Sequence, residues 1–173
     1  AGRIASGVFR TGDEITVMPS GITSKIKSID TLKGELKEAF APMSVSITLE
    51  EDIDVSRGDM IVRSNNKPEK HQDIEVMLCW LQSDIAKPRE KYHLKHTSNE
   101  QMAMIKEIIY KFDISKLERD FEDKELKMND IAKVKIRTSK PIMFDTYREN
   151  KTTGSFILVN SATNETVAAG MIV

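Results

Sequence analysis

Two histidines three positions apart, His93 and His96 in the stretch YHLKH, are the first residues whose types suggest chemistry. Imidazole nitrogens are common zinc ligands, and a structural zinc site needs about four ligands. If this segment is a strand, residues three positions apart lie on opposite faces, so the pair cannot share one metal without a bulge. The other histidine and the single cysteine, His71 and Cys79, are isolated in the sequence. We therefore interpret the pair as half-exposed strand residues, and Cys79 within MLCWL as a core thiol.

An acidic cluster after the stretch MSVSITL is the second candidate for chemistry. Paired carboxylates can perform general acid–base catalysis when their environments separate their pKa values. These carboxylates adjoin a turn after an alternating segment, which favours a solvated loop over a buried pair. The cluster consists of Glu50, Glu51, Asp52 and Asp54.

Nucleotide binding would require a recognisable phosphate-binding loop. Such a loop has Gly-x4-Gly followed by Lys and Ser/Thr, because backbone amides hold the phosphates while the lysine reaches the outer oxygens. Glycines 2, 7 and 12 have this spacing, but neither pair is followed by the required lysine. The stretch NKPE at 66–69 resembles the guanine-reading Asn-Lys-x-Asp, but it ends in glutamate. We therefore predict no catalytic, cofactor-binding or metal-binding residue in this chain.

The stretch DVSRGDMIV places Arg57, Gly58 and Asp59 directly before three apolar residues. An adhesion role for this tripeptide would require an exported protein, and the Asn-x-Thr sequons at Asn150 and Asn164 also matter only after secretion. Glycine permits a positive φ at a turn, and aspartate can bond back to the local backbone. We interpret residues 57–59 as a structural turn that leads into a strand.

Composition limits the class of protein and its partners. A chain of 173 residues, 39% hydrophobic and 31% charged, can form one domain or two small ones. Its 26 basic and 27 acidic residues are mixed, so no one-signed field directs it toward nucleic acid or a membrane. A single cysteine suits a reducing compartment, and no apolar run approaches the ~20 residues that span a bilayer. We expect a cytoplasmic location and interpret the chain as a piece of a longer protein.

Alternating apolar and polar residues predict strands along most of the chain. The clearest are 43–49, where Met, Val, Ile and Leu alternate with polar residues, and 132–137, where Ala, Val and Ile alternate with Lys and Arg. Runs of β-branched residues predict further strands at RIASGVF, EITVM, IKSIDTL, FILVN and TVAAGMIV. Many short strands separated by turns predict an all-β fold built as barrels or sandwiches.

Three segments interrupt this pattern. The stretch NEQMAMIKEIIYKFDI fits an amphipathic helix, because Met102, Ile105, Ile108, Ile109 and Phe112 have helical spacing. It fits a long bent strand almost as well, with one face formed by Met104, Ile108, Tyr110 and Phe112. The charged stretch ISKLERDFEDKELKMND favours a helix or an irregular connection. The polar run RSNNKPEKHQD favours an interdomain linker, which predicts domains at 1–67 and 68–173.

Five stretches, in order and over nearly the whole chain, resemble a known family. They are GRIASGVFRTGDEITVMPSG, EDIDVSRGDMIV, CWLQSD, YHLKHTSNEQ and KMNDIAKVKIRTSKPIMFDTYRENKTTGSFILVNSATNETVAAGMIV. The family is the C-terminal region of the large GTPase subunit of bacterial sulfate adenylyltransferase (ATP sulfurylase), which also occurs fused to adenylylsulfate kinase. The wider resemblance is to elongation factor Tu and its relatives. The resemblance implies two small β-barrels in tandem, similar to domains II and III of elongation factor Tu, and a strand at NEQMAMIKEIIYKF.

The resemblance also implies a function for the parent protein. Its GTPase domain, which would hold GTP and Mg, is expected before residue 1. GTP hydrolysis is expected to drive formation of adenosine 5′-phosphosulfate from ATP and sulfate, with adenylyl transfer in a small subunit. This chain would then be non-catalytic, and its partners would be its own GTPase domain and that small subunit. The alternative is a stand-alone binding module for RNA or protein, but the mixed charge and 6% aromatic content argue against an RNA surface.

The stretch DTYRENKTTGSF is the candidate for docking these partners. It places Tyr147, Arg148, Asn150 and Lys151 between the apolar stretch PIMF and the strand SFILV, so these residues are expected to project from a barrel edge. Tyrosine and arginine are enriched at interface hot spots. The alternative is an ordinary solvated hairpin loop.

Overall fold

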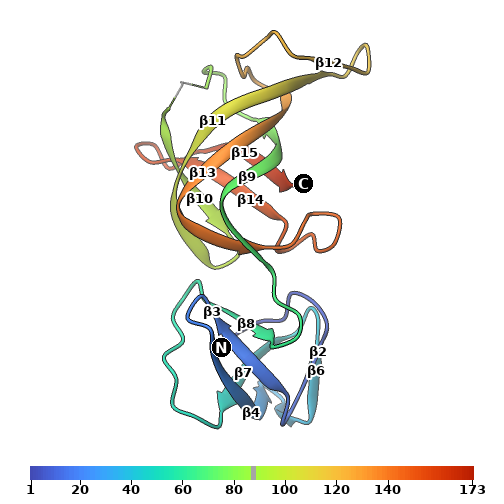
Figure 1. Cartoon of the computed structure of the whole chain (residues 1–173), viewed down its shortest axis with the longest axis vertical. Coiled ribbons are helices and arrows are strands. Elements are labelled where there is room, and N and C mark those ends of the chain that lie inside the picture. The colour runs from blue at the N-terminus through green and yellow to red at the C-terminus, as the bar shows by residue number, and fades with distance from the viewer. Residues whose placement is uncertain (87–88) are drawn as a thin grey trace. The chain divides into compact units, whose positions relative to one another are not determined.

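The protein folds entirely into β-strands and turns across the residues that this computed structural model describes, 1–86 and 89–173 (Figure 1). The chain divides into two compact units, Ala1–Pro68 and Glu69–Val173. The all-β fold class predicted from alternation is confirmed, and the amphipathic helix considered for the segment after Ser98 is wrong. None of the described residues forms a helix that could cross a bilayer.

The N-terminal unit contains a curled antiparallel sheet in the order β1-β7-β4-β3-β8. Alternating apolar and polar residues along the strands produce the core of this unit. Val45, for example, is buried while its neighbours Ser44 and Ser46 are exposed. A ribbon of β2 and β6 completes the unit. The strands are β1 (Gly2–Arg3), β2 (Val8–Arg10), β3 (Glu14–Met18), β4 (Ile22–Thr31), β5 (Gly34–Leu36), β6 (Glu38–Phe40), β7 (Ser44–Leu49) and β8 (Met60–Arg63).

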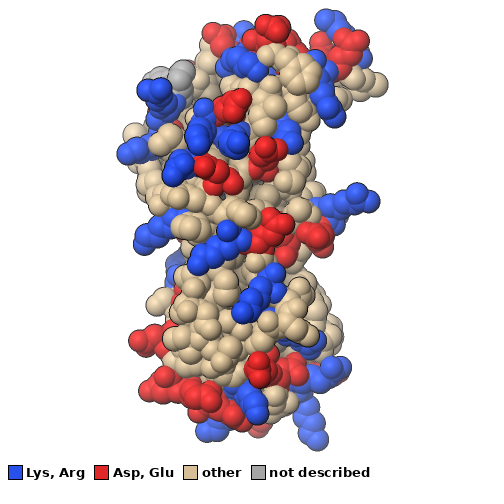
Figure 2. Space-filling model, in the orientation of Figure 1, with Lys and Arg blue, Asp and Glu red and all other residues tan. Residues whose placement is uncertain are grey.

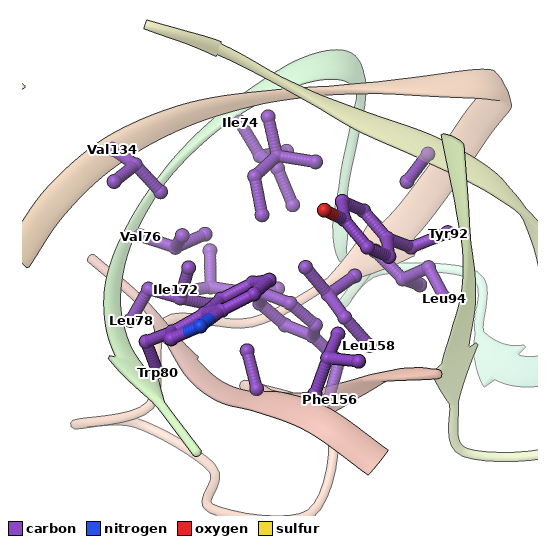
Figure 3. Packing of buried hydrophobic residues seen from close by; sticks show 14 of the residues in the cluster. Ile74, Val76, Leu78, Trp80, Tyr92, Leu94, Val134, Phe156, Leu158 and Ile172 are labelled. Carbon is purple, nitrogen blue, oxygen red and sulfur yellow. The ribbon is translucent and has the colours of Figure 1, made fainter. Parts of the chain in front are cut away.

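The C-terminal unit is a closed antiparallel barrel in the order β10-β14-β15-β9-β13-β11, and pairing of β10 with β11 closes it. Figure 3 shows the apolar interior, in which the rings of Trp80 and Tyr92 meet edge to face at 5.8 Å. The strands are β9 (Glu69–Trp80), β10 (Lys91–His96), β11 (Asn99–Asp113), β12 (Glu118–Asp120), β13 (Ile131–Phe144), β14 (Ser155–Asn160) and β15 (Thr166–Ile172).

The first of two register shifts in β11 explains why its sequence has helical spacing. The shifts against β13 fall between Ile105 and Glu107 and between Ile108 and Tyr110. The first shift changes which face the next residues occupy, so the core receives Ile105 and then Ile108, three positions later. The single face predicted for the bent strand is therefore wrong: Ile108 packs on the core, while Tyr110 pairs with the outward-facing Lys133.

The remaining segments also differ in detail from their predictions. β9 begins at Glu69, so the second half of the predicted linker, including His71, is strand that pairs with β13. The charged stretch after Ile114 is an irregular connection that contains only the short β12. Lys111 from β11 anchors it with ion pairs of 2.7 Å to Asp123 and 2.6 Å to Asp130.

Candidate docking surface

The loop between β13 and β14 is held in one conformation by its own hydrogen bonds. The Thr146 hydroxyl and amide donate to the Glu149 carboxylate at 2.8 and 3.2 Å, and these bonds lower the pKa of Glu149. The side-chain oxygen of Asn150 accepts from the Thr152 amide at 3.0 Å. The Thr153 hydroxyl donates to Asp145 at 2.6 Å. The loop is therefore ordered by hydrogen bonds between its own residues.

The loop is also tied to two strands of the barrel. The Tyr147 amide donates to Ile172 O of β15 at 2.9 Å, and the Ile172 amide donates to Gly154 O at 2.8 Å. His96 of β10, only 2% exposed, donates from Nε2 to Thr153 O at 2.6 Å. The prediction that His96 is half-exposed is wrong, because the end of β10 lies beneath this loop. His93 lies on the opposite face with its side chain 36% exposed, as the spacing argument requires.

Burial of His96 makes the barrel sensitive to acid. Desolvation lowers the pKa of His96 below its ordinary value of 6.5, although Thr153 and Asp145 oppose the shift. Below pH 6.5 the unfolded chain therefore binds a proton that the folded chain excludes, and stability falls as the pH falls. We expect His96→Gln to cost about 1–3 kcal/mol at pH 7.5 and to reduce the acid slope. Urea unfolding from pH 7.5 to 5 measures both effects, and His93→Gln is the matched control. If the dependence of stability on pH is the same in His96→Gln and the wild type, His96 is not the group responsible.

The predicted docking residues occupy different positions on this ordered loop. Tyr147 and Lys151 line an open groove of about 660 Å³ on the outside of the C-terminal barrel. Arg148 is exposed but lies outside the groove, and the Asn150 side chain serves the loop itself. The structure thus brings two of the four residues, Tyr147 and Lys151, to one surface. Their role in docking stays a prediction.

The floor of the groove consists of outward-facing apolar residues that the sequence analysis did not select. Cross-strand pairing aligns Ile157, Ala169, Cys79 and Ile131 in one row over β14, β15, β9 and β13. Met171 and Met77 are paired in the adjacent row. We call these six residues the apolar face. Ile157 and Met171 are 36% and 40% exposed.

Cys79 corrects a further prediction, since it lies on this outer face and is not a core thiol. Alternation sends its neighbours Leu78 and Trp80 into the interior, where they are 0% and 1% exposed. The signal that could have found the apolar face is the loss of alternation in VMLCWL and in FILV. A strand that is apolar on both faces is either covered on both sides or presents an apolar surface.

The turn at residues 56–59 has the backbone conformation that requires glycine. Gly58 has φ of +97°. The Asp59 amide donates to Ser56 O at 3.0 Å, and the Ser56 amide donates to the Asp59 carboxylate at 2.8 Å. The Arg57 side chain is exposed, and β8 begins one residue after Asp59.

Gly58→Ala is expected to lower the free energy of unfolding by about 1 kcal/mol or more, because a side chain strains a positive φ. Chemical denaturation of the purified chain measures the loss. Gly2→Ala is the control, because a methyl group there meets nothing within 4 Å. Equal stability of the Gly58 variant and the wild type would show that the backbone tolerates a side chain at this turn.

The other candidates for chemistry are dispersed. Among residues 1–86 and 89–173, no group of three or more His, Cys, Asp or Glu side chains could hold a metal ion. The carboxylates of the 50–54 cluster are exposed, as predicted, and the Glu51 carboxylate accepts a hydrogen bond from Ser24.

Two solved structures share this fold. Sup35 complexed with GDP superposes with a TM-score of 0.89 at 17% identity, covering 99% of this chain and 42% of that chain. Sup35 complexed with GMPPNP gives a TM-score of 0.86 over the same shares. At this identity the likeness shows the fold alone. This chain therefore shares the fold of part of sup35.

The chain belongs to the GTP-eEF1A C-terminal domain-like family, which matches residues 73–173. Over 99% of its length it is also similar to three relatives. These are the bifunctional enzyme CysN/CysC of Mycobacterium tuberculosis (44% identity) and of Rhodopirellula baltica (47%), and sulfate adenylyltransferase subunit 1 of Bacteroides fragilis (43%). The resemblance inferred from the sequence stretches is confirmed. The chain spans 28%, 26% and 36% of the lengths of these relatives.

Proposed function

We propose that this chain is the non-catalytic C-terminal part of the GTPase subunit of a sulfate adenylyltransferase. The observation that carries the proposal is the identity of 43%, over 99% of the chain, with sulfate adenylyltransferase subunit 1 of Bacteroides fragilis. The remaining length of those relatives leaves room for a GTPase domain, in which GTP and Mg²⁺ would bind. The small subunit would carry out adenylyl transfer from ATP to sulfate, in the cytoplasm.

The role of the two β units in this proposal is coupling. GTP hydrolysis can drive adenosine 5′-phosphosulfate synthesis only if the nucleotide state changes contacts with the small subunit. A closed barrel with an ordered loop provides a rigid body that can transmit such a change. A stand-alone RNA-binding module is less well supported, because Lys and Arg side chains lie among Asp and Glu side chains on the face shown in Figure 2.

A chimera tests the proposal directly. The 173 residues replace the matching segment of the Mycobacterium tuberculosis relative, and GTP-stimulated formation of adenosine 5′-phosphosulfate is measured with the cognate small subunit. We expect stimulation to be retained. A control chimera carries the matching segment of sup35, which has the same fold at 17% identity, and should show no stimulation. Loss of stimulation in a folded first chimera, or its retention in the control, contradicts the proposal.

The isolated chain provides the complementary measurement. Because its sequence lacks a phosphate-binding loop, calorimetric titration with GTP, GDP or a non-hydrolysable analogue is expected to show no binding. Saturable binding of any of these nucleotides would contradict the assignment of GTP to a separate domain.

A further inference from the structure

We propose that the apolar face of the C-terminal barrel docks an acidic, amphipathic segment of the small subunit. This inference rests on the proposed function, which supplies that subunit. It assigns the contact to one surface, which is the floor of the groove between Lys95 and Lys151.

The fold itself does not require the apolar face. An antiparallel strand with one solvated face normally alternates apolar and polar residues, and large exposed apolar patches mark interaction sites. Here Cys79, Ala169 and Ile157 form a continuous apolar row between Ile131 and Lys95. The interior of the barrel already has its own core from the opposite faces of the same strands. The apolar face is therefore available for a partner.

The charges around the groove select the chemistry of that partner. The groove is lined by Lys95 and Lys151 but by no aspartate or glutamate, in a chain that has 27 acidic residues. Among the described residues Lys151 forms no ion pair, and Lys95 has only a 3.7 Å contact with the half-exposed Glu100. Such an exposed pair contributes little. A segment with apolar side chains flanked by carboxylates complements this surface.

Tyr147 supplies an anchor that is already positioned. Its amide is bonded to Ile172 O at 2.9 Å, and its backbone lies against Gly154. A backbone held in place before binding loses little conformational freedom on docking, which favours affinity. Tyrosine beside an apolar floor is also a common hot-spot arrangement.

A separate subunit fits this surface better than a second copy of this chain or a GTPase domain joined to it. In a symmetric dimer of this chain, the lysines of both copies would lie at one interface and repel each other. A GTPase domain joined to the chain already has a high effective concentration at this surface, so a charged rim would add little to its rate of association. A separate, diffusing subunit gains association rate from a complementary charged rim.

The test uses the complete GTPase subunit and the purified small subunit, with binding followed by biolayer interferometry. Met171→Glu adds a charge to the apolar face, and Ala169→Trp fills the groove without adding charge. We expect each variant to weaken binding at least ~30-fold with an unchanged melting temperature. Ile114→Glu is the control, because Ile114 is a 60% exposed apolar residue outside the groove. Wild-type affinity in both groove variants would overturn the inference.

The lysine rim is tested separately through kinetics. Lys95→Glu combined with Lys151→Glu is expected to lower the association rate constant about tenfold at low salt, and less at high salt because ions screen the rim. An association rate constant that is unchanged in this double variant would contradict the acidic character assigned to the partner.

The outcomes separate this inference from the proposed function. If the wild-type subunits bind and GTP stimulates turnover, but the groove variants bind normally, the docking site is wrong and the proposed function stands. If wild-type subunits do not bind, the proposed function fails as well. The groove variants could bind the small subunit normally but lose self-association on gel filtration, or expose the GTPase domain to limited proteolysis. Either result would assign the groove to another occupant and overturn the inference.

Discussion

Gly154→Ala is expected to lower the free energy of unfolding of the C-terminal unit by about 3 kcal/mol or more. A methyl group at this position would lie 2.4 Å from both Cα and N of Tyr147 and 2.7 Å from the carbonyl carbon of Thr146. These contacts are with backbone, which cannot rotate away as a flexible side chain can. The residue is glycine because the loop between β13 and β14 passes directly over its own beginning.

Urea denaturation of the purified chain measures this effect. Lys151→Ala in the same loop is the control and should change stability by less than about 0.5 kcal/mol, because Lys151 is exposed. Because the clash displaces Tyr147, the proposed docking also predicts that the Gly154 variant binds the small subunit more weakly, even under conditions in which it is fully folded. A loss of stability below about 1 kcal/mol would show that the two ends of the loop can move apart at little cost.

Leu158→Ala is expected to cost about 2–5 kcal/mol, whereas Ile157→Ala should cost less than about 1 kcal/mol. The two residues are neighbours on β14 with side chains of equal volume. Leu158 is 0% exposed and points into the interior seen in Figure 3, while Ile157 is 36% exposed on the apolar face. The difference therefore isolates the direction in which the side chain points.

Thermal and chemical unfolding of the two variants measures this pair of effects. The proposed docking predicts the opposite order for binding to the small subunit once both proteins are folded, because only Ile157 contributes to the groove. Similar destabilisation by the two substitutions would contradict the register between β14 and β15.

Much of the fold could be predicted from local pattern. The alternation at 132–137 placed Ala132, Val134 and Ile136 in the core, and all three are fully buried. The stretch EITVM coincides with β3. Such predictions succeed because successive side chains of a strand always point to opposite faces, wherever the strand lies.

The candidate surface could be predicted only in part. Tyr147 and Lys151 were selected from residue type and loop position, and both line the groove. The apolar face was not selected, because Cys79, Ala169 and Ile157 come from strands that are distant in sequence and are joined only by sheet pairing. Buried apolar residues and outward apolar residues look the same in a stretch such as FILV.

The sequence by itself determined most of the strands, the turns that separate them and the lack of a phosphate-binding loop, since each depends on residues close together in the chain. The tertiary structure decided where register shifts and long-range pairing direct each side chain. The register shift between Ile105 and Glu107 sent both Ile105 and Ile108 inward and produced helical spacing within a strand. Burial of His96 depends on Thr153, which is distant in sequence. Cys79 points outward, but it lines a groove only because β15 and β13 pair on either side of β9. These properties arise from neighbours that alternation along one strand does not specify.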